Sequence, residues 1–449
     1  ITIKIKNHRL PIKVTLEKDI GCEIYKWAED LFPICRSITG PGVRETLSYL
    51  SNIVPEIKIF SVPTGYEAFD WTVPNEWSVQ TANISDMQGN VIVDFSKNNL
   101  HLVGYSQPVD TVMELAELEK HLFSLPDLPD AIPYVTSYYN QSWGFCITDN
   151  QRKKFKADKY RVHIDATLEP GVLNYGELII PGTSHREILL SCYICHPSLA
   201  NNELSGPVVT TALARWLQNL SSRYYTYRII FIPETIGSIV YLSKHVEHLK
   251  KFVDAGLVIT CVGDDDNYSF LPSRTGNTLI DRVALYVMKN FLKDFKTYSF
   301  LDRGSDERQY CSPLIDLPVA SIMRTKYGEY AEYHTSLDDL SFISPKGLMG
   351  SFNLIQTVIS CLEINRTYKA KVLCEPHLGK RNLYPKFSTT NRSEYLSSEI
   401  LLDILAYCDG KTDLLEIAQI IEQPILKLKQ SVDILLENGL IELINDQHV

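Results

Sequence analysis

The stretch EILLSCYICHPSLANNELSGPVV, residues 187–209, carries a mostly apolar run, a histidine and a polar segment in succession. Residues 187–194 have the length and composition of a parallel strand that is buried on both faces. From Gly206 onward the apolar residues follow the spacing of a helix. Strand, turn and helix in this order predict one unit of an α/β domain, with His196 at the carboxyl end of the strand.

Cys192, Cys195 and His196 also match the C-x-x-C-H pattern of covalent haem attachment. That attachment needs an oxidising compartment, and the opening ITIKIKNHRLPIKV has no apolar block of the kind found in secretory signals. The ten cysteines are spread over 449 residues without a tight framework, as is typical of a reduced cytoplasmic protein. We therefore expect a cytoplasmic protein in which the two cysteines fill the core and the histidine has another use.

Apolar runs and helical patterns alternate between about residue 160 and residue 365. The expected strands cover residues 159–168, 175–182, 187–194, 227–233, 255–263 and 317–323. The expected helices cover residues 206–220, 237–252, 278–292 and 345–363. This alternation predicts an α/β fold with a largely parallel sheet, in which ligands bind at the carboxyl ends of the strands.

Two further regions differ from this alternation. Residues 61–129 contain short alternating runs broken by Pro, Gly and Asn, which predicts a small inserted β domain. The α/β domain would then comprise residues 16–60 and 130–370, followed by a linker over 371–392. Residues 393–449 show three helical patterns and a β-like end, as in a winged helix.

The charge balance bears on possible partners. The net charge of −10 argues against a protein that coats nucleic acid or an anionic membrane. From Ser393 onward there are eleven Asp or Glu residues against three Lys and no Arg, the wrong sign for reading DNA. No apolar run reaches the roughly 18 residues that cross a bilayer. We therefore expect the winged helix to contact protein, with DNA reading as the weaker alternative, and leave oligomerisation open.

Four polar segments follow the predicted strands or lie beyond them. They are HPSLANNELSG with His196, FIPETIGS with Glu234, GDDDN with Asp264 and Asp265, and EYHTSLDDL with His334. Imidazole and carboxylate groups are ligands that Zn²⁺ prefers, and a carboxylate beside the metal can take a proton from its water. Each segment alone is an ordinary surface histidine, helix start or acidic turn. Their recurrence at successive strand ends predicts a metal site.

At these residues the sequence resembles the zinc aminopeptidase superfamily, which includes double-zinc leucyl aminopeptidases and glutamate carboxypeptidase. HPSLANNELSG, FIPETIGS and HTSLDD resemble its metal-site motifs in order. LFPICRSITG, FDWTVP, ICHPSLAN, GSDERQYCSP and EPHLGKR resemble the signatures of a bacterial family of aminopeptidase-like proteins, often linked to surface-polysaccharide biosynthesis. The resemblance covers nearly the whole chain. It implies a mostly parallel mixed sheet with helices on both faces, a small inserted β domain and a C-terminal winged helix.

The resemblance implies that His196 and His334 are metal ligands and that Glu234 is the general base. The superfamily's bridging aspartate corresponds to Asn202, and its second glutamate corresponds to Thr235. Two divalent cations repel each other, and a neutral Asn202 cannot offset that repulsion as a bridging carboxylate does. We therefore expect one Zn²⁺, held by the two histidines with Asn202 or a carboxylate. Glu234 would be the third ligand or the base, but not both.

Other matches concern the substrate. An aspartate that the superfamily places near residue 260 is Thr260 here, although Asp264 and Asp265 follow shortly after. GSDERQY resembles the superfamily's Gly-Ser-Asp-His element, which implies that Asp306 supports catalysis or faces the substrate. A free α-amine of the substrate would be held by acidic groups among Asp264, Asp265, Asp306 and Glu307.

Two functions follow as expectations. The first is a zinc-dependent aminopeptidase or amidase that acts on a small peptide or aminoacyl-type substrate. The second is a binding or scaffold protein that keeps the fold without the chemistry, as the replacements at Asn202, Thr235 and Thr260 suggest. Transcriptional control through DNA is a third and weaker interpretation.

Overall fold

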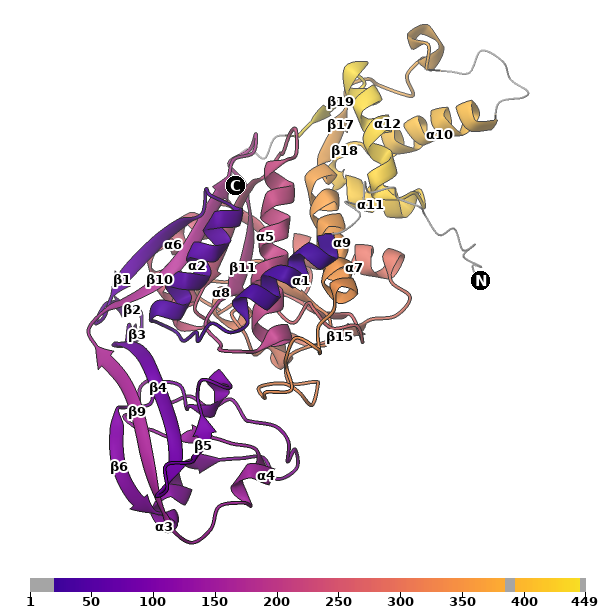
Figure 1. Ribbon diagram of the computed structural model, residues 1–449. Coiled ribbons are helices and arrows are strands. Elements are labelled where there is room, and N and C mark those ends of the chain that lie inside the picture. The colour runs from indigo at the N-terminus through magenta and orange to yellow at the C-terminus, as the bar shows by residue number, and fades with distance from the viewer. Residues whose placement is uncertain (1–19, 384–391, 445–449) are drawn as a thin grey trace.

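The computed structural model describes residues 20–383 and 392–444 (Figure 1). Its centre is an eight-stranded sheet in the order β1-β10-β12-β11-β13-β16-β14-β15. These strands are β1 (Lys58–Pro63), β10 (Val172–Ile180), β11 (Glu187–Tyr193), β12 (Thr226–Ile232), β13 (Val253–Val258), β14 (Ser269–Leu271), β15 (Lys296–Thr297) and β16 (Val319–Met323). The four middle strands β12, β11, β13 and β16 are parallel, while β10 and β14 run antiparallel to them. The predicted mixed, mostly parallel sheet is confirmed.

Helices cover both faces of this sheet. One face carries α1 (Ile20–Leu31), α2 (Pro41–Ile53), α5 (Ser205–Gln218), α7 (Leu279–Phe291) and α9 (Pro345–Ile364), and the other carries α6 (Ile236–Phe252) and α8 (Glu307–Tyr310). Every residue of β11 is buried. Ile188, Leu190 and Cys192 pack into the first core cluster, whereas Leu189 packs into the second. Because side chains alternate along a strand, this apolar run fills both cores.

Helix α9 is long and apolar enough to cross a membrane, but 67% of its apolar window is buried inside the protein. It packs against α1, α5 and α7. A central helix in a large hydrophobic core is expected to be buried in this way.

The inserted β domain forms the lower lobe in Figure 1. Its antiparallel sheet has the order β5-β4-β9-β6, and β7 pairs with β8 beside it. The elements of this lobe are β4 (Glu76–Asp86), β5 (Val91–Asp94), β6 (Val109–Glu114), α3 (Leu115–Leu118), β7 (Leu122–Phe123), β8 (Phe145–Cys146), α4 (Asp149–Arg152) and β9 (Lys159–Glu169). The short hairpin of β2 (Glu67–Ala68) and β3 (Trp71–Thr72) precedes them in the chain, and β2 contacts α6. Strand β9 was expected in the α/β domain, but it pairs along β4 here, beyond the expected boundary at residue 129. Its burial alternates, which is typical of an antiparallel sheet with one solvated face.

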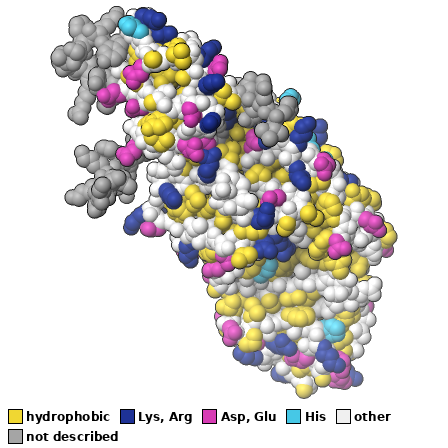
Figure 2. Space-filling model, turned by 180° about the vertical axis from the view of Figure 1, so that it is seen from behind, with side chains coloured by type: hydrophobic (Ala, Val, Ile, Leu, Met, Phe, Trp, Pro, Cys, Tyr) yellow, Lys and Arg dark blue, Asp and Glu magenta, His cyan; other side chains and the backbone are white. Residues whose placement is uncertain are grey.

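The C-terminal unit consists of α10 (Arg392–Tyr407), β18 (Asp409–Asp413), α11 (Leu414–Ile420), α12 (Ile425–Glu437) and β19 (Ile441–Leu443). Its sheet has the order β18-β17-β19, and the central strand β17 (Thr367–Ala370) directly follows α9. The unit therefore begins before the linker expected over 371–392, of which residues 384–391 lie outside the described part of the chain. Acidic and basic side chains are interspersed on the face of the molecule shown in Figure 2.

Candidate metal centre

His196 lies just beyond β11, where the chain turns into α5. The turn is a short π-type helix, Ala200–Leu204, of a kind that is frequent at functional sites. The buried carboxylate of Asp338 holds this turn: its two oxygens accept the backbone N–H groups of Asn201 at 2.6 Å and Asn202 at 3.0 Å. The HTSLDD segment, through Asp338, thus fixes the turn that carries Asn202.

Hydrogen bonds at its backbone and at its side chain hold Asn202 against Tyr193 and Thr260. The Thr260 hydroxyl donates to the backbone carbonyl of Asn202 at 2.9 Å, and it lies 2.5 Å from the Tyr193 hydroxyl. Since Thr260 has a single hydroxyl proton, Tyr193 donates to Thr260 and accepts from Asn202 Nδ2 at 2.7 Å. The other atom of the side-chain amide, Asn202 Oδ1, is buried without a partner in the described structure.

Glu234 follows β12 at the neighbouring strand end. Its Oε1 accepts a hydrogen bond from Ser305 Oγ at 2.8 Å, and its Oε2 lies 3.6 Å from His196 Nε2. The Glu234 side chain is 21% exposed and the His196 side chain 5% exposed, so the carboxylate can meet water. Burial raises the pKa of Glu234 above its ordinary value.

Asp306 supports the turn after Glu234. Its Oδ1 accepts the Thr235 N–H at 2.7 Å and the Ser238 hydroxyl at 2.8 Å, while Thr235 has a φ of 65°. Helix α6 has no side-chain cap of its own, so this carboxylate from another loop serves its positive end. Burial, and then the charge of Glu234, raises the pKa of Asp306.

His334 reaches the centre from the loop between β16 and α9. Its backbone has a φ of 55°, a left-handed value that is unusual for histidine, and its ring stacks on Tyr333 at 3.9 Å between centroids. Burial, and then the nearby His196, lowers the pKa of His334 to about 3, so the ring is neutral. His334 Nε2 is buried and has no hydrogen-bond partner among the described residues.

The two imidazoles come together. Their ring centroids are 5.5 Å apart with an interplanar angle of 41°. Two rings that share one Zn²⁺ through bonds of about 2.0–2.1 Å have centroids about 5 Å apart. Unpartnered, buried His334 Nε2 and Asn202 Oδ1 add the donor atoms that such a cation needs. The residues present therefore fit one zinc ion.

Glu203 and Arg36 belong to this centre but were missed in the sequence. Glu203 Oε2 lies 2.9 Å from His196 Nδ1, and Glu203 Oε1 lies 3.5 Å from Arg36 Nε. Arg36 also donates to the His196 carbonyl at 3.0 Å, and both charged side chains are fully buried. Cys195, His196 and Glu203 together could form a second cation cluster, but the Arg36 guanidinium beside it opposes a cation there.

The remaining acidic residues named from the sequence lie in different surroundings. Asp264 is buried and accepts hydrogen bonds from Asn201 Nδ2 and from both the N–H and the hydroxyl of Thr325. Asp265 is 42% exposed beside Lys346. Glu307 is fully buried, where its Oε1 accepts the Gly304 N–H, the Ser305 N–H and the Tyr327 hydroxyl.

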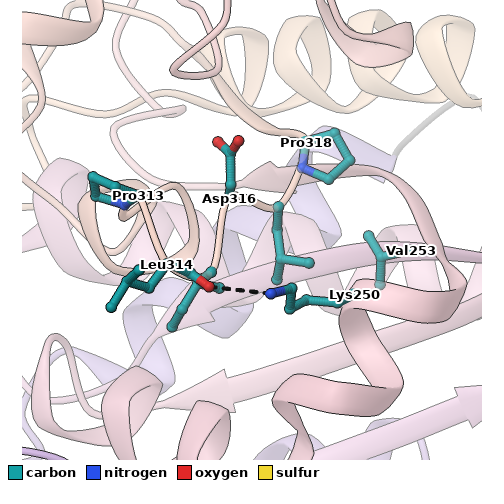
Figure 3. Close-up of a pocket in the computed structure, with 8 residues that line it drawn as sticks. Lys250, Val253, Pro313, Leu314, Asp316 and Pro318 are labelled. Atoms are coloured by element: carbon teal, nitrogen blue, oxygen red, sulfur yellow. Dashed lines mark hydrogen bonds between the residues drawn. The ribbon is translucent and has the colours of Figure 1, made fainter.

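A separate hollow of about 320 Å³ lies on the surface at the start of β13 (Figure 3). Lys250 Nζ donates to the Leu314 carbonyl across it at 3.2 Å. Asp316 at its rim is paired with Arg274. None of the candidate metal ligands lines this hollow.

Comparisons with known proteins agree with this architecture. A family model described as a domain of unknown function, DUF4910, matches residues 25–365, and a winged helix-turn-helix model matches residues 366–443. A protein of Clostridium acetobutylicum is 42% identical over 95% of this chain and 97% of its own length; its name assigns it to polysaccharide biosynthesis and gives it an aminopeptidase-like domain.

Two crystal structures place the fold among peptidases. One, described as a peptidase of Clostridium acetobutylicum, has 41% identity and a TM-score of 0.87 over 94% of this chain and 96% of that chain. The other, a zinc aminopeptidase of Bacillus subtilis, has 14% identity and a TM-score of 0.54 over 76% of this chain and 93% of that chain. The second likeness concerns the fold alone. The predicted aminopeptidase-like fold with a C-terminal winged helix is confirmed.

Proposed function

Since the chain belongs to the DUF4910 family, whose domain here has the fold of zinc aminopeptidases, we propose that it is a zinc-dependent aminopeptidase or amidase. Its substrate would be a small peptide or an aminoacyl-type amide. One observation carries the proposal: a buried and a half-buried imidazole converge beside a carboxylate that reaches solvent, and one imidazole nitrogen is buried with no partner among the described residues. Perturbed, buried titratable groups of this kind cluster at functional sites.

His196, His334 and Asn202 would hold the cation. When bound, Zn²⁺ would polarise the amide carbonyl and lower the pKa of water from bulk values toward neutrality. Three protein ligands leave the open position that catalysis requires. With Asn202 as the third ligand, Glu234 is free to act as the base.

Glu234 would move the proton. Its Oε1 is fixed by Ser305, so Oε2 is the oxygen that takes a proton from the attacking water. A pKa raised by burial lets the same carboxyl group keep that proton and return it to the leaving amine. Asp306 acts through the backbone, because its hydrogen bond to the Thr235 N–H holds the turn that aims Glu234.

An assay with aminoacyl-arylamides after loading with zinc tests this proposal. Glu234→Gln should keep its zinc and lose about 10²–10⁴-fold in kcat/KM, the usual contribution of a positioned base. Glu329→Gln, an exposed change elsewhere on the same loop as His334, is the matched control and should leave kcat/KM unchanged. A wild-type protein that retains no zinc, even after refolding with the metal, would end the proposal.

A second function is a binding or scaffold role without catalysis, favoured by the neutral residues at Asn202, Thr235 and Thr260. The name of the relative from Clostridium acetobutylicum supports a place in polysaccharide biosynthesis for either function. Zinc that binds tightly without any hydrolysis across a panel of amides would favour the second function.

A further inference from the structure

The inserted β domain reaches into the metal centre through its segment 132–134. This segment lies between β7 and β8 and pairs antiparallel with residues 334–336. Ile132 N–H donates to Ser336 Oγ at 2.9 Å, and Ser336 N–H donates to the Ile132 carbonyl at 2.8 Å. Tyr134 N–H donates to the His334 carbonyl at 2.8 Å. A short ladder thus fastens the inserted domain to the loop that carries a candidate ligand.

The same segment is tied back to its own domain. Gly104 N–H donates to the Val135 carbonyl at 2.9 Å, and Ser137 N–H donates to the Gly104 carbonyl at 3.0 Å. Tyr134 and Tyr138 hold each other through hydroxyls that are 2.8 Å apart. The segment therefore connects the inserted domain to the loop that carries His334.

The ring of Tyr134 touches both imidazoles. Its centroid lies 5.2 Å from that of His196 at 67° and 5.1 Å from that of His334 at 86°. Both are edge-to-face contacts, the arrangement that aromatic rings prefer when they pack together. Tyr193 packs on His196 alone and Tyr333 on His334 alone. Within the described chain, Tyr134 is the aromatic ring that joins the two.

The backbone of His334 needs support from its neighbours. A histidine with a φ of 55° is strained, and such strain persists only where the surroundings over-determine the backbone. We propose that Tyr134 is a positioning residue through which the inserted β domain holds the His196 and His334 rings in the one arrangement that can share a cation. This inference rests on the proposed function, since it concerns the same site. It gives the inserted domain a role in building the metal centre.

Zinc affinity of the full-length chain, measured by competition with a chromogenic chelator, tests the inference without any substrate. Tyr134→Ala should bind zinc at least tenfold more weakly than the wild type, because neither ring is then held. Tyr134→Phe keeps both ring contacts and should bind within about twofold of the wild type. Tyr139→Ala removes an exposed ring five residues after Tyr134 and should also leave the affinity unchanged.

Tyr134→Leu keeps the variant measurable if the alanine protein does not fold, and it should weaken zinc binding at least threefold. Wild-type affinity in a folded Tyr134→Ala or Tyr134→Leu protein would overturn the inference. A wild type that takes up no zinc would instead overturn the proposed function, and the inference with it. In NMR spectra, the Cε1–H resonances of His196 and His334 should shift in Tyr134→Ala and Tyr134→Leu but not in Tyr139→Ala. A general loss of stability would not produce this selective shift.

Discussion

At the scale of single residues, the centre combines metal-type ligands with neutral replacements for carboxylates. Asn202 is bound by Tyr193 at its side-chain Nδ2 and by Thr260 at its backbone carbonyl, and its side-chain Oδ1 is unpaired in the described structure. Thr235 contributes backbone rather than side chain to the arrangement, through its bond to Asp306. These replacements lower the negative charge and so favour one cation over two.

Replacing Asn202 by Asp should raise zinc affinity at least tenfold while the stoichiometry stays near one. The added carboxylate strengthens the ligand set, but Thr235 and Thr260 still lack the carboxylates that a second ion needs. Equilibrium dialysis with metal analysis measures both quantities. Two ions per chain in this variant would contradict the account, and unchanged affinity would remove Asn202 from the ligand set.

The ion pair of Arg36 and Glu203 gives a second residue-scale prediction. Glu203→Ala should lower the free energy of unfolding by about 3–5 kcal/mol, because it leaves Arg36 buried without its counter-charge. The double variant Arg36→Met with Glu203→Leu should recover much of the lost free energy of unfolding. It should still bind zinc more weakly than the wild type, because His196 Nδ1 then has no hydrogen-bond acceptor. Urea unfolding and chelator competition provide the two readouts, and full zinc affinity in the double variant would contradict the role of Glu203.

The sequence predicted His196, Glu234 and His334 because each lies beside a recognisable motif near a strand end. Arg36 and Tyr134 could not be found in this way, since they reach the site from loops far away in the chain. Glu203 lies within the quoted stretch, but its direction depends on the π-type turn. Asp306 was named from its motif, yet its contact with the Thr235 backbone depends on the tertiary fold.

At the scale of elements, the close packing of α5 on the sheet depends on Gly206. A Cβ at this position would lie 2.3 Å from the Ile259 carbonyl oxygen, which is backbone and cannot turn aside. Gly206→Ala should therefore lower the free energy of unfolding by about 1–3 kcal/mol. That loss exceeds the gain in helix propensity of about 1 kcal/mol. Urea unfolding against an exposed Ser221→Ala control measures it, and a more stable variant would contradict the packing.

The C-terminal unit is held on the α/β domain partly by Asp413. Its carboxylate accepts hydrogen bonds from Arg282, from Asn365 and from the Glu416 N–H. Burial alone raises the pKa of Asp413, but these bonds outweigh it, so the pKa lies below its usual value. A lowered folded pKa gives stability that is complete above the unfolded pKa of about 4 and is lost as the pH falls through the folded value.

Acidification from pH 6 to pH 3 should therefore destabilise the wild type more than Asp413→Asn, which has already lost the charge. At pH 7 the variant should be less stable by about 1–3 kcal/mol, as expected for hydrogen bonds to a charged group. Fluorescence-monitored unfolding of the two proteins between pH 7 and pH 3 measures both the acid sensitivity and the difference in stability at pH 7. Equal acid sensitivity of the two proteins would show that Asp413 does not titrate as described.

Element boundaries were predictable only where local pattern and tertiary pairing agree. The pattern of residues 159–168 suggested a strand, but the choice of sheet depends on pairing with β4. Strand β17 completes the C-terminal sheet from before the expected linker, a contact that no local pattern reveals. The apolar run of β11 was placed correctly because burial on both faces leaves a direct compositional signal.

At the scale of the whole molecule, the C-terminal unit and the α/β domain share one core. Leu428 and Val432 of α12 belong to the same buried cluster as Leu354 and Ile355 of α9. Helix α12, third in the winged-helix order, therefore packs against the α/β domain as well as its own unit. The arrangement favours a fixed part of the molecule over a freely tethered reader of DNA.

Duplex DNA should accordingly bind no more tightly than about 10⁻⁴–10⁻⁶ M at physiological salt, the range of non-specific binding. The excess of acidic residues after Ser393 is the physical reason. Fluorescence anisotropy with a pool of random duplexes at several salt concentrations checks this. Nanomolar, salt-sensitive binding to one selected sequence would contradict it and restore the DNA interpretation.

The account depends most on one cation shared by the two imidazoles. Zinc-edge anomalous diffraction from crystals grown with zinc chloride tests this directly. We predict one strong peak in contact with His196 Nε2 and His334 Nε2, beside the Glu234 carboxylate. No peak between these rings, or a peak on the Cys195 and Glu203 side of His196, would contradict the account.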